Sequence, residues 1–113
     1  MPRMTDLLIA GAASLIISNA FAECNPPGQI RIPDGSTATS EEMVNGQKQV
    51  KAYMAEMEAY LQCMDDESAA LGDAETDEQK RIHIEKHNAA VEEMEAIAAS
   101  FNEQVRAYKA VQD

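Results

Sequence analysis

Apolar side chains recur at alternating three- and four-residue steps in two long stretches of the chain. One stretch runs from Thr39 to Leu71 and the other from Thr76 to about Val111. This heptad spacing aligns apolar residues along one stripe of a helix, as in helices that pack side by side. The two stripes comprise Met43, Val50, Met54, Met57, Leu61, Met64 and Leu71, and then Ile84, His87, Val91, Met94, Ala98, Phe101, Val105 and Tyr108. The pattern therefore predicts two long helices and an all-α fold.

Residues typical of helix ends bound both stretches. Thr39 with Glu42, and Thr76 with Gln79, have the spacing of a capping box, in which each side chain accepts a hydrogen bond from the other residue's backbone N–H. Gly72 follows the first stretch, and glycine is the usual residue just past a helix end. Only a short acidic link then separates the helices, so we expect an antiparallel, coiled-coil-like hairpin.

The link also fixes which residues face each other. The facing pairs predicted for the stripes include Met64–Ile84 and Met54–Met94. The opposite-charge pairs predicted along one flank are Lys51–Glu95 and Asp65–Arg81. Two helices alone bury little apolar surface, so a homodimer forming a four-helix bundle is an alternative to a monomer.

The first 22 residues have the features of a signal peptide. Arg3 gives a short positive region, residues 7–17 form an apolar run too short to span a bilayer, and Ala20-Phe21-Ala22 matches the small-x-small cleavage pattern. Cleavage would leave a mature chain that begins at Glu23 in the periplasm. An uncleaved membrane anchor is the alternative.

Residues 23–38 contain three prolines and two glycines, which favour extended and turn conformations. An exported chain with two cysteines, Cys24 and Cys63, is expected to join them in a disulfide. Cys63 lies about 36 Å along the first helix, within the roughly 50 Å that the extended segment can reach. We therefore expect a signal peptide (1–22), an extended segment pinned by the disulfide (23–38) and a helical hairpin domain (39–113).

An apolar flank beside the first stripe offers the segment a surface to cover. Tyr53 and Tyr60 lie on this flank, and the pinned segment is expected to place Ile30 and Ile32 over them. Methionine side chains nearby are flexible and suit an adaptable contact surface. The candidate surface for a protein partner, exposed when the segment lifts away, comprises Tyr53, Tyr60, Met54 and Met57.

The formal net charge of −11 excludes two classes of partner. Nucleic acids and anionic membrane surfaces both require a basic face, so neither is expected to bind the mature chain. A protein partner remains, whose identity the sequence does not indicate.

Two histidines are the first candidate for a metal site. His83 and His87 stand four residues apart, which brings both imidazoles onto one helical face for a divalent transition metal. Glu67 is expected near His83 across the hairpin, as a third ligand. Isoleucine follows His83 at the position where the metalloprotease pattern has glutamate, so the pattern's catalytic base is missing. The competing interpretation is that His83 pairs with surface acids.

A methionine cluster is the second candidate. The predicted register brings Met54, Met57 and Met94 together, and thioethers in an oxidising compartment can bind Cu(I). Methionines at this spacing also serve as flexible core residues, which is the competing interpretation.

No catalytic set of nucleophile, base and orienting group is apparent. The serines at 36–40 suit turn and cap chemistry, and the cysteines do not form a C-x-x-C pair. The carboxylates lie on solvent-facing positions, where nothing desolvates a paired acid and base. We therefore expect no enzyme activity.

The run from Pro33-Asp34-Gly35 through TSEEM (39–43), VKAY (50–53) and EAYLQC (58–63) resembles a group of small exported proteins of Gram-negative bacteria without an assigned function. The PDG turn and the tyrosine-leucine-x-cysteine motif carry the resemblance. It implies a periplasmic address and transfers no catalytic residue. The leading hypothesis is a periplasmic helical protein that acts through protein–protein contact, in an accessory, assembly or chaperone-like role. The alternative is a metal-binding periplasmic protein.

Overall fold

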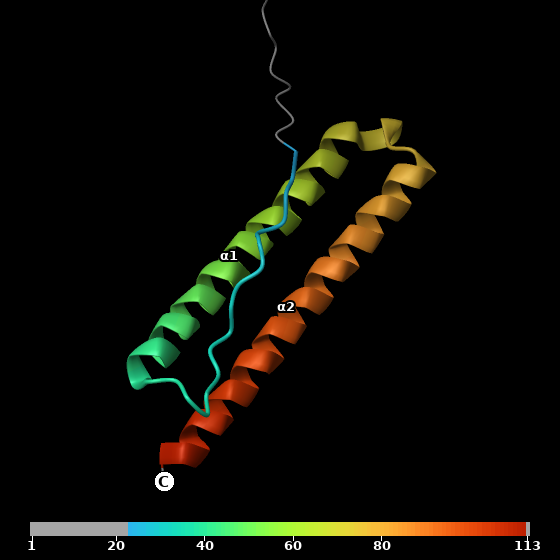
Figure 1. The fold of residues 1–113 in the computed structure, drawn as a ribbon. Helices are drawn as coiled ribbons and strands as arrows, with labels where there is room; N and C mark the ends of the chain where they lie inside the picture. The colour runs from blue at the N-terminus through green and yellow to red at the C-terminus, as the bar shows by residue number, and fades with distance from the viewer. Residues whose placement is uncertain (1–22, 113) are drawn as a thin grey trace, which may run out of the picture.

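The computed structural model describes residues 23–112 of the chain, which form two long helices and an extended segment (Figure 1). Helix α1 (Ser40–Leu71) and helix α2 (Asp77–Gln112) are joined by the short 3₁₀ helix η1 (Gly72–Ala74). Residues 23–112 contain no strand, so the expected all-α fold is confirmed. Neither helix in this range is long and apolar enough to cross a membrane. The expected signal peptide, 1–22, lies outside the described residues.

Both helices begin at the side-chain caps that the sequence predicts. Thr39 Oγ1 accepts a hydrogen bond from the Glu42 backbone N–H at 3.1 Å. At the start of α2, Gln79 N–H donates to Thr76 Oγ1 at 3.0 Å, and Thr76 N–H donates to Gln79 Oε1 at 2.8 Å. Helix α1 stops at Gly72, whose positive φ of 52° is readily adopted by glycine and rarely by other residues.

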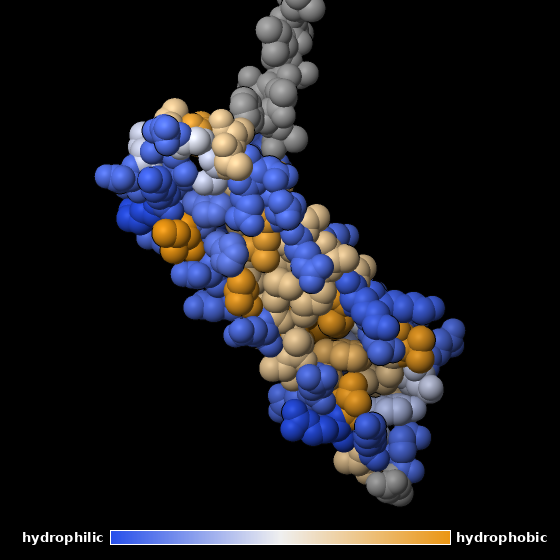
Figure 2. Space-filling model, turned by 180° about the vertical axis from the view of Figure 1, so that it is seen from behind, coloured by the Kyte–Doolittle hydropathy of each residue, from blue (hydrophilic) through white to orange (hydrophobic). Residues whose placement is uncertain are grey.

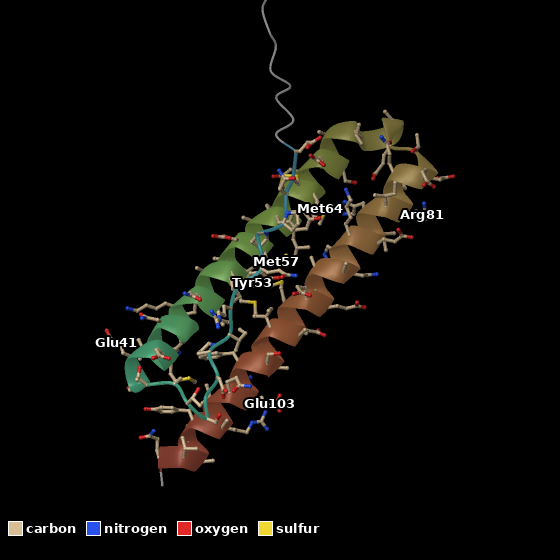
Figure 3. The ribbon with its side chains drawn as sticks, in the orientation of Figure 1. Glu41, Tyr53, Met57, Met64, Arg81 and Glu103 are labelled. Atoms are coloured by element: carbon tan, nitrogen blue, oxygen red, sulfur yellow. A yellow bond between two sulfur atoms is a disulfide. The ribbon has the colours of Figure 1, made fainter. Side chains whose placement is uncertain are left out.

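The two helices pack side by side through a core supplied mostly by α1 (Figure 3). The core cluster comprises Tyr53, Met57, Tyr60 and Met64 of α1 and Ala90 of α2. Met57 is 3% exposed and Tyr53 is 4% exposed, so both are fully enclosed by neighbours. The α1 members are spaced by three and four residues, which places them on one side of the helix. Apolar burial of this kind is the main source of stability in a small fold.

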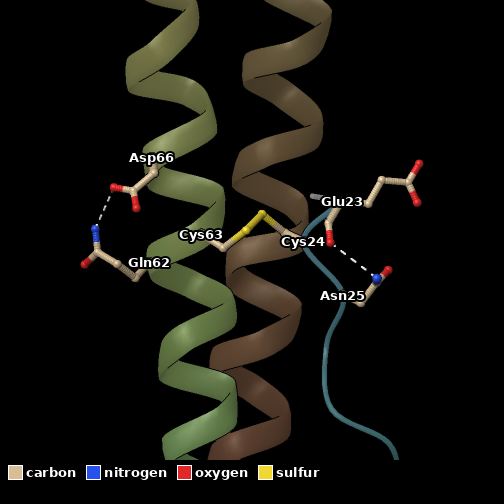
Figure 4. The surroundings of a disulfide bond; sticks show 6 residues. All are labelled: Glu23, Cys24, Asn25, Gln62, Cys63 and Asp66. Atoms are coloured by element: carbon tan, nitrogen blue, oxygen red, sulfur yellow. Dashed lines mark hydrogen bonds between the residues drawn. A yellow bond between two sulfur atoms is a disulfide. The ribbon is translucent and has the colours of Figure 1, made fainter. Parts of the chain in front are cut away.

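The extended segment, residues 23–38, lies along the two helices and is joined covalently to α1 (Figures 1 and 4). Its Cys24 forms the expected disulfide with Cys63, with the two Cα atoms 5.7 Å apart. Ile30 packs against the core cluster, as predicted, and Ile32 is half-buried. The segment thus adds a third layer over part of the helix pair.

Two glycines allow the far end of the segment to approach both helices. Gly35 N–H donates to Gln104 Oε1 of α2 at 2.8 Å, and a Cβ on Gly35 would stand 1.8 Å from the Gln104 carbonyl oxygen. On α1, a Cβ on Gly46 would stand 2.7 Å from the Pro33 ring and 3.3 Å from the Phe101 ring. Both approaches require a residue without a side chain.

The turn of the PDG motif is closed by its own aspartate. Asp34 Oδ1 accepts hydrogen bonds from the Ser36 hydroxyl at 2.6 Å and from the Ser36 backbone N–H at 3.0 Å. These two bonds, the hydroxyl first, lower the pKa of the Asp34 carboxyl. The Asp34 carbonyl oxygen accepts from the N–H groups of Thr37 and Ala38. The prediction of turn chemistry at these serines and threonines is confirmed.

The predicted register is wrong in detail near η1. Met64 is buried, but its predicted partner Ile84 is 57% exposed. His83 faces α1 instead, with its Nε2 atom 3.2 Å from Asp65 Oδ1. Helix α2 is therefore turned so that the side carrying Ala90 packs in the core, because both α1 and the extended segment offer apolar contacts on that side.

The two predicted flank ion pairs do not form either. Arg81 bonds Glu78 and Glu85 of its own helix, three and four residues away, and these carboxylates raise its pKa. Asp65, its predicted partner, bonds His83. Lys51 and Glu95 make no ion pair within residues 23–112. Neighbours on one helix pair with little extra ordering, which favours the local contacts of Arg81.

Candidate functional site

The side of the helix pair beneath the extended segment is the predicted partner surface, and we call it the covered face. A groove of about 300 Å³ remains there, lined by Tyr53, Met57 and Tyr60 of α1, by Ala90 of α2, and by the segment's two adjacent prolines. The three α1 residues are buried core residues. The fourth predicted surface residue, Met54, is half-buried. The predicted surface is thus largely occupied by the chain's own segment.

The Tyr53 hydroxyl is the group on the covered face whose acidity is altered. Burial, and to a lesser degree the negative charge of Glu93, raise the pKa of Tyr53 above its ordinary value of 10.0. Glu93 lines the same groove. The covered face therefore disfavours the phenolate form of Tyr53.

The three methionines of the predicted cluster lie in or beside the core. Met57 belongs to the buried core, and Met54 and Met94 pack against it. Met57 lies among the tyrosines of the covered face, whereas Met54 and Met94 are half-buried beside the core. Their surroundings match the packing role of methionine, in which a flexible side chain fills an irregular interior.

The histidine pair lies near the start of α2. The ring centroids of His83 and His87 are 6.4 Å apart, the rings are inclined by 34°, and both residues are half-buried. The acid that reaches His83 is Asp65, two residues before the expected Glu67 on α1. The Asp65 carboxylate thus lies against Nε2 of His83, one of the two nitrogens that a metal could use.

Glu67 instead lies beside the disulfide. Its carboxylate and the sulfurs of Cys24 and Cys63 lie within 4.8 Å of one another, and within residues 23–112 this is the one group of three His, Cys, Asp or Glu ligand atoms so close together. Because the sulfurs are bonded to each other, they offer no thiolates to a metal. Glu67 and His83 both line a hollow of about 410 Å³ between the segment and the helices.

A second apolar surface lies on the other side of the helix pair, and we call it the open face. It comprises Met54 and Leu61 of α1 and Ile84, Val91, Ala98 and Val105 of α2. The α2 members are seven residues apart, so they form one straight column along the helix. None of the six is buried. Seen from behind, the molecule shows hydrophobic side chains along its middle, between hydrophilic margins (Figure 2).

Two contributions were missed at the sequence level. The Gln104 side chain accepts a hydrogen bond from the Gly35 N–H, although Gln104 lies outside the predicted α2 stripe. The column of the open face was assigned to the interface between the helices. Gly46, three residues after Met43 in the α1 stripe, was the available signal that another segment packs closely on α1, since a glycine among core positions indicates a close approach of other atoms.

Comparison with protein families, curated proteins and solved structures finds no match to this chain.

Proposed function

We propose that this chain is a periplasmic helical protein that acts through protein–protein contact, in an accessory, assembly or chaperone-like role and without catalysis. Its working form is an antiparallel, coiled-coil-like hairpin with the extended segment pinned by the disulfide. Contacts along the helices support this arrangement: Asp65 meets His83 near η1, and Gly46 meets Phe101 far from it. Such a succession of contacts is expected when two joined helices run in opposite directions.

The observation that carries the proposal is the low burial of α2. This 36-residue helix has one buried residue, Ala90, although its sequence has an apolar stripe along its whole length. An amphipathic helix normally faces a core with such a stripe. A contiguous apolar surface that remains accessible on a small protein is characteristic of a contact site.

The test is site-specific cross-linking in the periplasm. A photo-activated amino acid at Ile84, the open-face residue that is 57% exposed, should give discrete cross-linked species. The same amino acid at exposed Ala99 is the matched control on the outer side of α2 and should give none. A strictly monomeric protein that cross-links to nothing from Ile84 would contradict the proposal. The mass of the purified chain tests the proposed export to the periplasm, because cleavage of the signal peptide predicts a first residue of Glu23.

A second candidate function is metal binding by the histidine pair. The observation that favours it is the Asp65–His83 contact, which adds a carboxylate to two imidazoles on one helical face. Titration with zinc or nickel should give an affinity that falls when both histidines become alanine. Comparing Asp65→Asn with Glu67→Gln identifies the third ligand. Affinity unchanged by the double histidine substitution would exclude this site, and a parallel Cu(I) titration tests the methionine cluster.

A further inference from the structure

Apolar residues occupy more of the circumference of α2 than its contacts within residues 23–112 cover. The column through Met94 and Phe101 faces α1, since Phe101 lies against Gly46 and Met94 packs on the core. The column through Ala90 and Ile97 also packs on the core cluster. Over the third column, the α2 part of the open face, residues 23–112 place no further layer. Helix α2 thus has three apolar columns, of which the described part of the chain covers two.

Charge is distributed unevenly around the molecule, and the open face is nearly neutral. The charged residues that lie three or four positions from its members, and so border it, are four bases (Lys51, Lys80, Arg81 and Lys109) and three acids (Glu58, Asp65 and Glu95). Their sum is +1, whereas the whole chain has a net charge of −11. The excess negative charge therefore lies on the other surfaces.

This distribution indicates the kind of partner. Two copies of an acidic protein repel each other least where each surface is closest to neutral. A strongly basic partner would be attracted to the acidic outer surfaces and would gain little at the open face. We propose that a second copy of this chain covers the open face, giving a two-fold symmetric four-helix bundle. This inference rests on the proposed function, because it names the partner of the same surface.

The symmetry also explains the ion pair that does not form within one chain. Lys51 and Glu95 border opposite edges of the open face, Lys51 beside Met54 on α1 and Glu95 beside Val91 on α2. They lie at a similar height, because Gly46 meets Phe101 on one side of them and Asp65 meets His83 on the other. A two-fold axis parallel to the helices sets α1 of each copy against α2 of the other. Lys51 of one copy then meets Glu95 of the other, twice in each dimer.

The first experiment measures the association of the oxidised chain purified from periplasm, by sedimentation velocity over a concentration series. The wild-type protein should dimerise. Ala98→Glu puts a carboxylate from each copy into the middle of the interface and should raise the dissociation constant more than about 100-fold. Ala99→Glu adds the same charge one residue away, on the exposed outer side of α2, and should change it by less than about threefold. Circular dichroism checks that both variants keep their helices.

The second experiment asks whether Lys51 and Glu95 meet between copies. Lys51→Glu and Glu95→Lys each place two like-charge pairs in the homodimer and should weaken it by about tenfold. Mixing the two variants restores both opposite-charge pairs, so native mass spectrometry should show mainly the mixed dimer. A pair within one chain cannot be restored by mixing.

The outcomes separate this inference from the proposed function. Two results would contradict a second copy on the open face. One is a wild-type protein that is monomeric at all concentrations. The other is a dimer whose dissociation constant is unchanged by both Ala98→Glu and Ala99→Glu. If that monomer still cross-links to another protein from position 84, and Ala98→Glu abolishes the cross-link, protein contact at the open face stands with a different partner. Mixing without preference for the mixed dimer would overturn the proposed two-fold axis.

Discussion

Helices α1 and α2 are similar in length and in apolar pattern, yet they differ sharply in burial. Helix α1 has 32 residues and six buried ones, whereas α2 has 36 residues and one. Helix α1 packs against α2 and is also bonded to the extended segment and covered by it. Helix α2 has a single enclosed stretch around Ala90. Periodicity thus makes a helix amphipathic, but a third layer is needed to enclose it.

Removing the disulfide should change this difference most. Cys24→Ser/Cys63→Ser frees a loop with a sequence separation of 39 residues, which costs about 4 kcal/mol of stability by the chain-entropy relation. The melting temperature should fall by more than about 10 °C while the helices persist at low temperature. Thermal unfolding followed by circular dichroism measures both. Equal melting temperatures for the oxidised and reduced wild-type protein would show that the disulfide contributes nothing.

Truncating one methionine in each helix compares the helices directly. Met57→Ala on α1 removes a side chain that is 3% exposed and should cost about 3 kcal/mol. Met94→Ala on α2 removes the same side chain from a half-buried site and should cost about 1 kcal/mol, since less surface is lost and water fills the space. Urea unfolding gives both values. Equal losses would mean that the two helices are enclosed alike.

Adding a methyl group to the segment tests its contact with α2. Gly35→Ala places a Cβ 1.8 Å from the Gln104 carbonyl oxygen, so the segment must move, at a cost of about 2 kcal/mol. Gly28→Ala is the matched control in the same segment, because a Cβ there meets nothing within 4 Å. It should be neutral or slightly stabilising. Comparable losses for the two variants would argue against close docking at Gln104.

The smallest effect is expected at alkaline pH. Because the pKa of Tyr53 is raised in the folded protein, the unfolded chain ionises first as the pH rises above about 10. The stability associated with the neutral phenol is fully present below that pH and is lost as the pH rises through the folded pKa. Tyr53→Phe should therefore reduce the fall in stability between pH 9 and about 11. Urea titrations at several pH values measure the slopes, and identical slopes would contradict a buried neutral Tyr53.

The elements of the fold were predictable because they depend on local chemistry. The caps at Thr39 and Thr76, the stop at Gly72 and the Cys24–Cys63 disulfide were all inferred from neighbouring residues and two cysteines, and they are confirmed. The rotation of α2 was not predictable in this way. It depends on how the extended segment competes with α2 for the surface of α1, and such long-range packing leaves no local pattern in the sequence.

In the candidate site, too, features that depend on spacing were predictable and those that depend on long-range packing were not. Spacing correctly put the three methionines in or beside the core, because apolar side chains on facing stripes turn toward the other helix. Glu67 was expected near His83 and lines the same hollow, but the carboxylate 3.2 Å from His83 is that of Asp65, because α2 is rotated relative to the predicted register. For the same reason Ile84 left the predicted interface and joined the open face.

The disulfide also determines how the protein would respond to a mechanical pull on its two ends. Tension that enters at residue 23 crosses from Cys24 directly to Cys63, so the part of the chain between them carries no load. The extended segment and the first three-quarters of α1 form a closed ring, with α2 as its tail. A stretched oxidised molecule is therefore shorter than a reduced one by the length of 39 residues, about 130 Å. Under force, α2 is peeled away while most of α1 is shielded.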